Sequence, residues 1–366
     1  MRLFLGGDVM LGRGVDQVLP HPGDPELQER SVRDARTYVE LAEARNGPVP
    51  RPVDWAWPWG DALAVLDAAE VDVRIVNLET SITRSGEFAR GKGVHYRMSP
   101  GNIPALTVAR PDVCVLANNH VLDFDLRGLT ETLDVLAAAG LRVAGAGRSA
   151  LAARAAAVVP APSAGGRVVV VAFGTPSSGI PTGWAATADR PGVDVLARLS
   201  DDEASGVLDR VRRVRRPSDV VVASIHWGSN WGYGVEADQV RFAHRLVDGG
   251  VDVVFGHSSH HPRPVEVHRG KLIFYGCGDL INDYEGIRGH EEYRDDLRLL
   301  YLVDVDPVAG DLLALRMAPL QARRLRLHRA STGDANWLRA VLDRISRPRG
   351  VRIDLEPGGL LALRPS

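Results

Sequence analysis

Short apolar runs recur along the first two-thirds of the chain, and each is bounded by Gly, Asp, Asn or Pro. Such runs predict buried strands, because continuous apolar character fits a sheet that is covered on both faces. The predicted strands are Leu3–Gly7, Val73–Leu78, Val113–Ala117, Val143–Gly145, Val168–Phe173, Val220–Ile225 and Val251–Gly256. Amphipathic stretches between them predict helices at Gly60–Ala69, Asn102–Ala109, Leu126–Ala139, Asp201–Val214 and Ala237–Asp248. This alternation is typical of a layered α/β fold.

The pattern changes after Pro264, where strand-like runs are joined by tight turns without intervening helices. These runs predict either an antiparallel extension of the sheet or a second sheet packed on the first. They are Val265–His268, Lys271–Tyr275, Leu297–Val305 and Leu312–Met317.

One domain with an insertion accounts for this organisation. We expect residues 1–320 to form it, with the insertion at about residues 20–58, and residues 321–366 to add a helix (Ala335–Ile345) and a short tail packed on the same domain. The insertion combines a predicted helical stretch, Glu26–Arg45, with a loop that carries three tryptophans. Those rings are interpreted either as the wall of a pocket or as the packing of the insertion onto the domain.

Composition narrows the class of protein. The 366 residues include 45% hydrophobic and 25% charged residues, which is ordinary for a globular protein. A net charge of −2 argues against a nucleic-acid partner, which would call for a basic excess. No apolar run reaches the roughly 18 residues of a membrane span and no signal sequence is evident, so a cytoplasmic protein is expected. The two cysteines predict neither a disulfide framework nor a cysteine-ligated zinc site.

Polar side chains gather where the predicted strands end. Each alone has an ordinary interpretation, as a cap, a solvated loop residue or a hydrogen-bonded core histidine. Five strands, however, each deliver a potential metal ligand at the carboxyl edge, where sites form in α/β sheets. The residues are Asp8, Asn77, Glu79, Asn118, Asn119, His120, His226, His257, His260 and His261. Oxygen ligands mixed with imidazoles suit Mn²⁺, Fe or Zn²⁺ and are typical of hydrolytic centres.

The ordered motifs GDVMLGR, NLET, NNH, HWG and GHSSH resemble those of CapA-type proteins of capsule and poly-γ-glutamate biosynthesis. That group belongs to the calcineurin-like metallophosphoesterase superfamily, and the resemblance runs from Gly6 to about Asn282. It implies a metallophosphoesterase-like α/β fold, a layered sandwich of two mixed β-sheets flanked by helices. The metal centre is expected at the strand ends.

Carried over residue by residue, the resemblance implies the metal ligands Asp8, Glu79, Asn119, His226, His257 and His260. His120 is expected to protonate the leaving group or hold the substrate, with its protonation state set by Asp123. Met10 stands where the superfamily has a further histidine ligand, which leaves open one ion or two. The doubled histidine of the closing motif leaves His261 as the alternative to His260.

Four residues near these motifs are candidates for substrate binding. Arg13, Arg97 and Arg263 could hold an anionic group through their guanidinium groups, or could form structural ion pairs instead. Trp227 directly follows His226 and could wall the pocket.

Three functions are consistent with these features. The leading one is a metal-dependent hydrolase of a small or polymeric anionic substrate, acting on a phosphoester or a γ-glutamyl amide. The second is a non-catalytic component of poly-γ-glutamate or capsule biosynthesis that binds an anionic polymer. The third is an enzyme acting on a small peptide or an amino-acid-derived metabolite. The sequence sets no oligomeric state.

Overall fold

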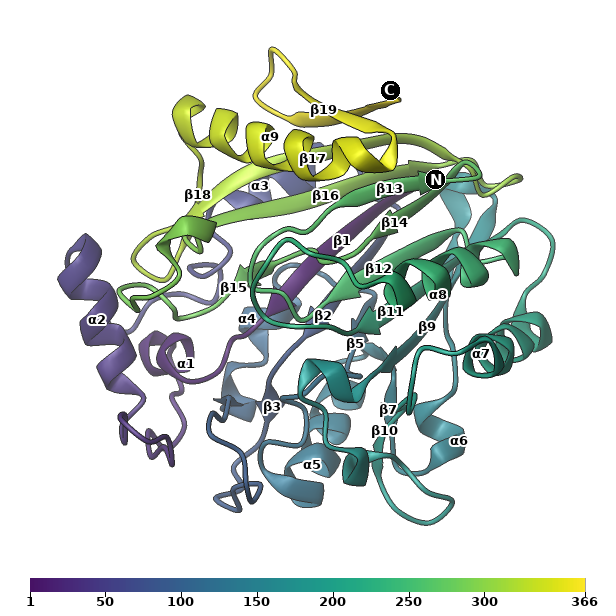
Figure 1. Cartoon of the computed structure of the whole chain (residues 1–366). Coiled ribbons are helices and arrows are strands. Elements are labelled where there is room, and N and C mark those ends of the chain that lie inside the picture. Colours follow the sequence, from purple (N-terminus) through teal and green to yellow (C-terminus); the bar gives the residue numbers. More distant parts are fainter. Residues whose placement is uncertain (366) are drawn as a thin grey trace.

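Two β-sheets lie face to face in the computed structural model, which describes residues 1–365 (Figure 1). The larger sheet has the order β19 (Val351–Leu355), β20 (Leu361–Pro365), β17 (Leu312–Ala322), β16 (Leu297–Val305), β1 (Arg2–Val9), β2 (Val73–Leu78), β5 (Val113–Val115) and β6 (Arg142–Ala144), with β15 (Asp279–Ile281) beside β1 and β18 (Leu327–Arg329) beside β17. The second sheet has the order β13 (Val265–His268), β14 (Lys271–Phe274), β12 (Val253–His257), β11 (Asp219–His226), β9 (Gly166–Gly174) and β8 (Ala157–Ala161).

Helices cover the outer faces of both sheets, whereas α9 (Thr332–Ser346) packs into the apolar layer that lies between the sheets. Two short strand pairs lie among the loops. The helices are α1 (Gly14–Val18), α2 (Arg36–Asn46), α3 (Asp61–Ala68), α4 (Pro104–Thr107), α5 (Asp125–Ala138), α6 (Ala150–Ala153), α7 (Asp201–Val214), α8 (Ala237–Asp248) and α9 (Thr332–Ser346). The short pairs are β3 (Ser81–Ile82) with β4 (Arg97–Met98), and β7 (Ala146–Gly147) with β10 (Gly192–Val193). None of the helices described within residues 1–365 is long and apolar enough to cross a membrane.

The core is divided into layers by the alternation of side chains along each strand. Leu3 and Leu5 of β1 point between the two sheets, where they join Val220 and Val222 of β11, whereas Phe4 packs on the outer face. Because successive strand residues face opposite sides, a strand covered on both sides is apolar throughout. The sandwich of two mixed sheets flanked by helices confirms the expected fold class.

The strands were largely foreseen, since every run predicted from the apolar pattern lies in an observed strand or overlaps one. The predicted helix Glu26–Arg45 is wrong in its first part, because α2 begins only at Arg36. Asp34 accepts the Arg36 amide at 2.8 Å and so fixes the start of the helix there. The tail after α9 forms β19 and β20, which the sequence prediction missed although residues 351–355 alternate between buried and exposed.

Parallel pairing brings the predicted site residues to one edge of the sandwich. β1 and β2 run parallel with Asp8 opposite Asn77, and β11 and β12 run parallel with His226 opposite His257. In both sheets these residues lie at or near the carboxyl ends of their strands. The register therefore places both groups at the same edge.

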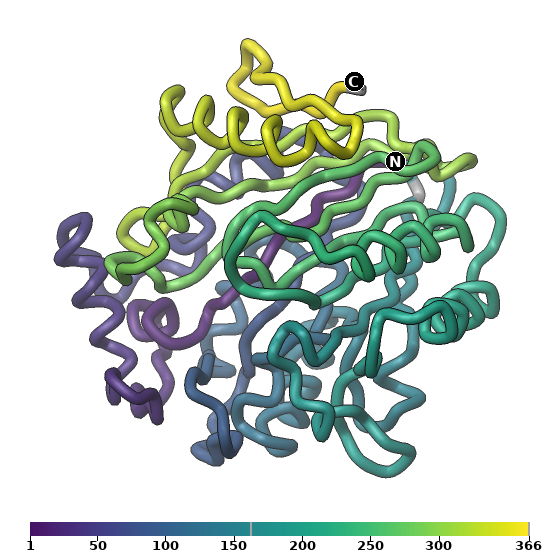
Figure 2. The backbone as a smooth tube through the Cα atoms, viewed as in Figure 1, coloured from purple at the N-terminus to yellow at the C-terminus, as the bar shows by residue number. Residues whose placement is uncertain are grey.

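The insertion is packed onto the domain by its tryptophans and lies along one side of the molecule (Figure 2). Trp59 is fully buried and donates its indole N–H to the Ala105 carbonyl at 2.7 Å, while Trp57 donates to the Arg324 carbonyl at 3.0 Å. These contacts support the packing interpretation of the two rings.

A buried arginine fastens the insertion to the loop that follows β15. Arg13 donates to both carboxylate oxygens of Asp283, at 2.9 and 2.5 Å, and to Glu29 at 2.9 Å. Its guanidinium lies 3.6 Å from the centre of the Tyr38 ring and 4.5 Å from that of Tyr96. This ion-pair cluster ties three distant segments together.

Replacing Asp283 with Ala is expected to lower the free energy of unfolding by about 3–5 kcal/mol, because it leaves the buried Arg13 charge with only one carboxylate partner. Equilibrium urea unfolding measures the effect. Asp134→Ala is the matched control: it breaks the exposed Arg148–Asp134 pair and is expected to cost less than about 1 kcal/mol. Equal losses in the two variants would contradict a structural role for the Arg13 cluster.

Candidate metal centre

Two carboxylates lie together at the ends of β1 and β2, and both are almost completely buried. Asp8 belongs to β1 and Glu79 directly follows β2. The side-chain amide of Asn77 lies between them and donates to Asp8 at 2.7 Å and to Glu79 at 3.2 Å. The structure therefore holds two acidic groups side by side away from solvent.

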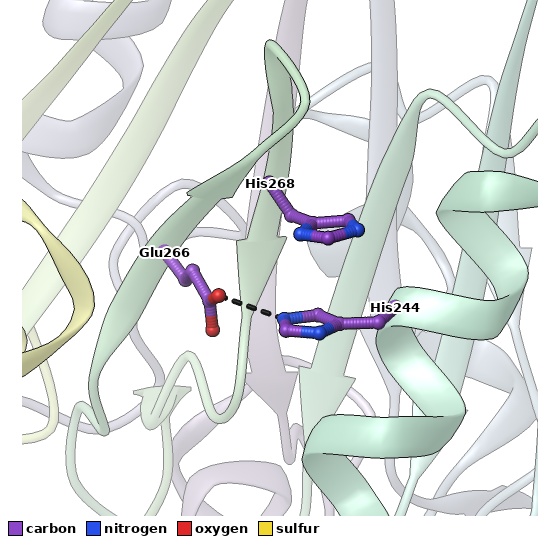
Figure 3. Close-up of side chains that lie close together, drawn as sticks. All are labelled: His244, Glu266 and His268. Carbon is purple, nitrogen blue, oxygen red and sulfur yellow. Dashed lines mark hydrogen bonds and ion pairs between the residues drawn. The ribbon is translucent and has the colours of Figure 1, made fainter.

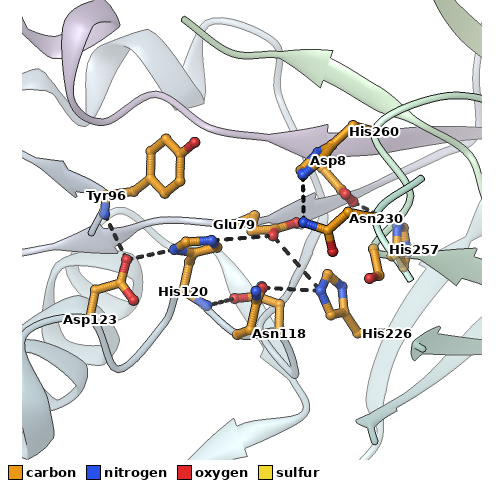
Figure 4. A network of polar contacts seen from close by, with 12 residues as sticks. Asp8, Glu79, Tyr96, Asn118, His120, Asp123, His226, Asn230, His257 and His260 are labelled. Atoms are coloured by element: carbon orange, nitrogen blue, oxygen red, sulfur yellow. Dashed lines mark hydrogen bonds and ion pairs between the residues drawn. The ribbon is translucent and has the colours of Figure 1, made fainter. Parts of the chain in front are cut away.

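Imidazoles from the second sheet complete this cluster (Figure 4). Potential ligand atoms of Asp8, Glu79 and His226 all lie within 4.8 Å of one another. His257 approaches Asp8 through Nδ1 at 3.1 Å, and the Asn119 side-chain oxygen lies 3.2 Å from His226 Nε2. Five of the six predicted ligands are thus brought into one group.

Three buried atoms of this group have no hydrogen-bond partner among residues 1–365: Asp8 Oδ2, His226 Nδ1 and His257 Nε2. Buried polar atoms are normally satisfied, so each of them needs an explanation. A divalent cation would satisfy carboxylate oxygens and unprotonated imidazole nitrogens together. The donor set therefore fits a metal ion of the Mn²⁺, Fe or Zn²⁺ type.

The pKa shifts of the buried side chains also favour a bound cation. Burial, together with the negative charge of Asp8, raises the pKa of Glu79 well above its ordinary range. Burial also opposes ionisation of Asp8, but the hydrogen bond and charge of His257 prevail and lower the Asp8 pKa. Burial lowers the pKa of His226 to about 3, which leaves its ring uncharged at neutral pH. Without a cation the two carboxylates oppose each other's ionisation, and a bound cation would remove that conflict.

His120 lies beside the cluster and is held by a second set of groups. Its Nδ1 is 2.7 Å from Asp123 and 2.9 Å from the Lys92 ammonium, while its Nε2 is 3.9 Å from Glu79 Oε1. Asp123 in turn accepts the Tyr96 amide at 2.6 Å. Burial lowers the pKa of His120 to about 4, so the ring is uncharged at neutral pH.

His260 lies beside Asp279 of β15, the strand that pairs with β1. Its Nδ1 lies 2.9 Å from Asp279, which pairs with Asp8 in the β1–β15 register, and its Nε2 lies 3.1 Å from the Asn230 amide. His261 instead stacks on Tyr293, with ring centres 4.4 Å apart. This placement favours His260 over His261 as the sixth ligand, and that assignment stays a prediction.

A cavity of about 250 Å³ borders His260 and is walled by aromatic rings and two arginines. Arg13 is one of the two, but its guanidinium is engaged by Asp283 and Glu29. Arg288 is the other, is exposed, and forms no ion pair within the part of the chain that the structure describes. Arg288 is therefore the guanidinium best able to bind an anion there.

The remaining predicted substrate-binding residues lie in other surroundings. Arg97 donates to the Ser85 and Asp24 carbonyls, and Arg263 donates to Ser229. Trp227 is fully buried, and its indole N–H donates to the Tyr275 carbonyl at 3.1 Å. The structure does not bring these three side chains to the cluster.

Several residues of the site escaped the sequence analysis. Lys92 offered one signal, since it is one of only two lysines in the chain, but its contact with His120 depends on a loop whose path the pattern does not define. Asn77 was noted at a strand end without its role as the hydrogen-bond partner of Asp8. Arg288 had no local signal, because only the folded loop places it in the cavity.

The chain is similar to known proteins of capsule and PGA synthesis. The family described as bacterial capsule synthesis protein PGA_cap matches residues 2–284. A Mycobacterium tuberculosis protein described as a probable polyglutamine synthesis accessory protein is 55% identical over the whole chain and 96% of its own length. The Bacillus subtilis PGA biosynthesis protein CapA is 25% identical over 92% of the chain and 79% of its own length. The Bacillus anthracis capsule biosynthesis protein CapA is 26% identical over 77% and 60%.

Glu79→Gln is expected to abolish the stabilisation that metal gives. At a Mn²⁺ concentration a hundred times the dissociation constant, the wild-type protein should gain about 2.7 kcal/mol and the variant close to none. Without metal the variant should be at least as stable as wild type, because it removes an ionisable group beside Asp8. Thermal unfolding of metal-stripped protein, with and without Mn²⁺, measures both effects. The exposed substitution Glu87→Gln is the control, and a wild-type Mn²⁺ response in Glu79→Gln would refute the assignment.

Proposed function

The chain belongs to the bacterial capsule synthesis protein family, and on that premise we propose that it is a metal-dependent hydrolase of an anionic substrate in capsule or poly-glutamate synthesis. One observation carries the proposal. Two buried carboxylates and two buried imidazoles lie together, and three of their own atoms have no hydrogen-bond partner within residues 1–365. Next to them lies His120, whose uncharged ring can exchange a proton.

The metal would be held by Asp8, Glu79, Asn119, His226 and His257, with His260 as the sixth ligand. A divalent cation at such a site activates water near neutral pH and polarises the bond under attack. The mixed oxygen and nitrogen donors suit Mn²⁺, Fe or Zn²⁺, bound as one or two ions. Asn77 keeps the two carboxylates in place by donating to both.

His120 is the group that moves a proton. When its Nδ1 donates to Asp123, its Nε2 keeps a lone pair on the side of Glu79. That nitrogen can take a proton from the attacking water and pass it to the leaving group as the bond breaks. Asp123 acts as a positioning residue, because its carboxylate accepts from Nδ1 and fixes the ring from the opposite edge. Lys92 holds Asp123 in turn by donating to the other oxygen of that carboxylate.

The cavity beside His260 supports an anionic substrate. Arg288 offers an exposed guanidinium there, and Tyr96, Tyr284 and Trp231 provide apolar walls that limit access of water. Two relatives are named for polyglutamine synthesis and for PGA biosynthesis. If the substrate is a γ-glutamyl polymer, its carboxylates would suit this arginine. The bond attacked is a phosphoester or a γ-glutamyl amide. Assays with one substrate of each kind distinguish the two activities.

His120→Asn is expected to lower turnover by about 10²- to 10⁴-fold, because it removes the proton-transferring nitrogen without removing a metal ligand. The assay follows hydrolysis of an aryl phosphodiester and of a γ-glutamyl oligomer in the presence of Mn²⁺. Metal content of the same preparations shows that the centre is still loaded. His328→Asn, on β18, is the matched control.

Two results would overturn the hydrolase proposal. One is wild-type protein that binds Mn²⁺ but hydrolyses neither substrate. The other is a His120→Asn variant as active as wild type. If the inactive wild-type protein still binds a γ-glutamyl polymer, the non-catalytic role in capsule synthesis replaces the hydrolase. The 55% identical relative described as an accessory protein makes this the relevant competitor.

Arg288→Gln is expected to raise KM for an anionic substrate about 10-fold or more, with little change in kcat, because a charge-assisted contact is lost outside the reacting atoms. Steady-state kinetics separate the two parameters. Arg339→Gln on α9 is the control, since that arginine lies away from the cavity. An unchanged KM in Arg288→Gln would remove this residue from the substrate site.

A further inference from the structure

A second group of histidines and carboxylates lies between α8 and β13, and the hydrolase proposal does not use it (Figure 3). Strand residues two apart point to the same side, so Glu266 and His268 share one face of β13. Helix residues four apart share a face, so His244 and Asp248 do the same on α8. The two faces meet, and ligand atoms of His244, Glu266 and His268 lie within 4.8 Å of one another.

Two hydrogen-bonded pairs cross from the helix to the strand. His244 Nε2 lies 2.7 Å from Glu266 Oε1, and His268 Nε2 lies 3.0 Å from Asp248 Oδ1. The two imidazole rings stack with centres 3.8 Å apart and planes 5° apart. Each histidine therefore meets a carboxylate of the other element. Two nitrogen donors and the Glu266 oxygen lie close together, and the Asp248 carboxylate stands beside His268.

Glu266 is oriented as a metal-binding carboxylate would be. Its Oε2 accepts the Tyr275 hydroxyl at 2.7 Å and the Arg349 guanidinium at 3.1 Å, which leaves Oε1 directed at the histidines. Hydrogen bonds of this kind fix the direction of a ligand oxygen. Burial would raise the Glu266 pKa, but these donors and His244 prevail and lower it, so the group is a carboxylate at neutral pH.

This cluster is separate from the metal centre. His268 pairs with Lys271, the first residue of β14, whereas the centre's His257 is the last residue of the parallel neighbour β12. The two groups therefore lie toward opposite ends of the same sheet. The side chains of His244 and His268 are 30% and 22% exposed, so an ion from solution can reach them.

We propose that His244, Asp248, Glu266 and His268 form a second, structural metal site for a divalent cation of the Zn²⁺ type. Two imidazoles and two carboxylates match the four-coordinate donor sets that zinc prefers. To bind, the stacked rings must splay so that one nitrogen of each points at a common ion, and Asp248 must turn toward the same ion. The partial exposure of these side chains allows both movements. The ion would replace the two hydrogen-bonded pairs and join α8 directly to the edge strand β13.

The test measures zinc binding to the full chain stripped of metal, by calorimetry and by metal analysis after gel filtration. Asp8→Asn is the background, because it disables the first centre and leaves the second to be counted alone. In this background we expect one bound Zn²⁺ and a rise in melting temperature on adding Zn²⁺. Adding His244→Ala and His268→Ala should remove the bound ion or weaken binding by more than about 100-fold.

His328→Ala in the same background is the matched control and should bind zinc as before. Circular dichroism checks that each variant is folded, and the milder pair His244→Gln and His268→Gln replaces the alanine pair if that one unfolds. If Asp8→Asn does not fold, the two histidine substitutions are made in the otherwise wild-type chain instead. There they should lower the number of bound zinc ions by one. Unchanged zinc binding in the double variant, or no zinc in the Asp8→Asn parent, overturns this proposal and leaves the hydrolase proposal intact.

Discussion

The burial of two neighbouring carboxylates is the constraint on which the rest of this structure depends. Asp8 and Glu79 are held side by side in a region without solvent, where two negative charges oppose each other strongly. A folded domain gains nothing in stability from that arrangement, because apolar residues of similar size would fill the space at lower cost. The arrangement becomes favourable when a cation occupies the site. The surrounding imidazoles, with their unsatisfied nitrogens, are arranged as such a cation requires.

Two rigid sheets hold this unfavourable arrangement in place. The carboxylates come from the parallel ends of the first sheet, and His226 and His257 come from the parallel ends of the second. The apolar layer between the sheets fixes the distance between these two groups. The loops around the centre are fixed by polar contacts instead. Arg13 joins Glu29 of the insertion to Asp283, and Asp279 with His260 holds the closing loop. Packing therefore sets the position of the ligands, and hydrogen bonds set their orientation.

The regular sequence pattern predicted the strands and the residues at their ends. It did not predict side-chain contacts between segments that are far apart in the sequence. Strand periodicity predicts that Asp8, Glu79 and His226 lie at strand ends, and parallel pairing then requires them to share an edge. Substrate-binding roles for Arg97 and Trp227 were inferred from nearness in sequence, whereas their side chains turn to backbone carbonyls elsewhere. Arg13 and Asp283 are 270 residues apart, and no local pattern could reveal their pairing. The contact of Lys92 with His120 was invisible for the same reason, since it depends on how a loop folds back.

The two histidine and carboxylate groups of this chain differ in burial, and that difference separates their roles. In the first, the side chains are almost completely buried and three atoms lack partners within residues 1–365, so a bound ion would relieve the group and the proposed hydrolysis would take place there. In the second, His244 and His268 are partly exposed, and each already has a carboxylate partner. That group is stable without an ion, so a metal would add only cohesion between α8 and β13. Under the two proposals, similar donor types would thus support catalysis where they are buried and unsatisfied, and structural cross-linking where they are accessible and already paired.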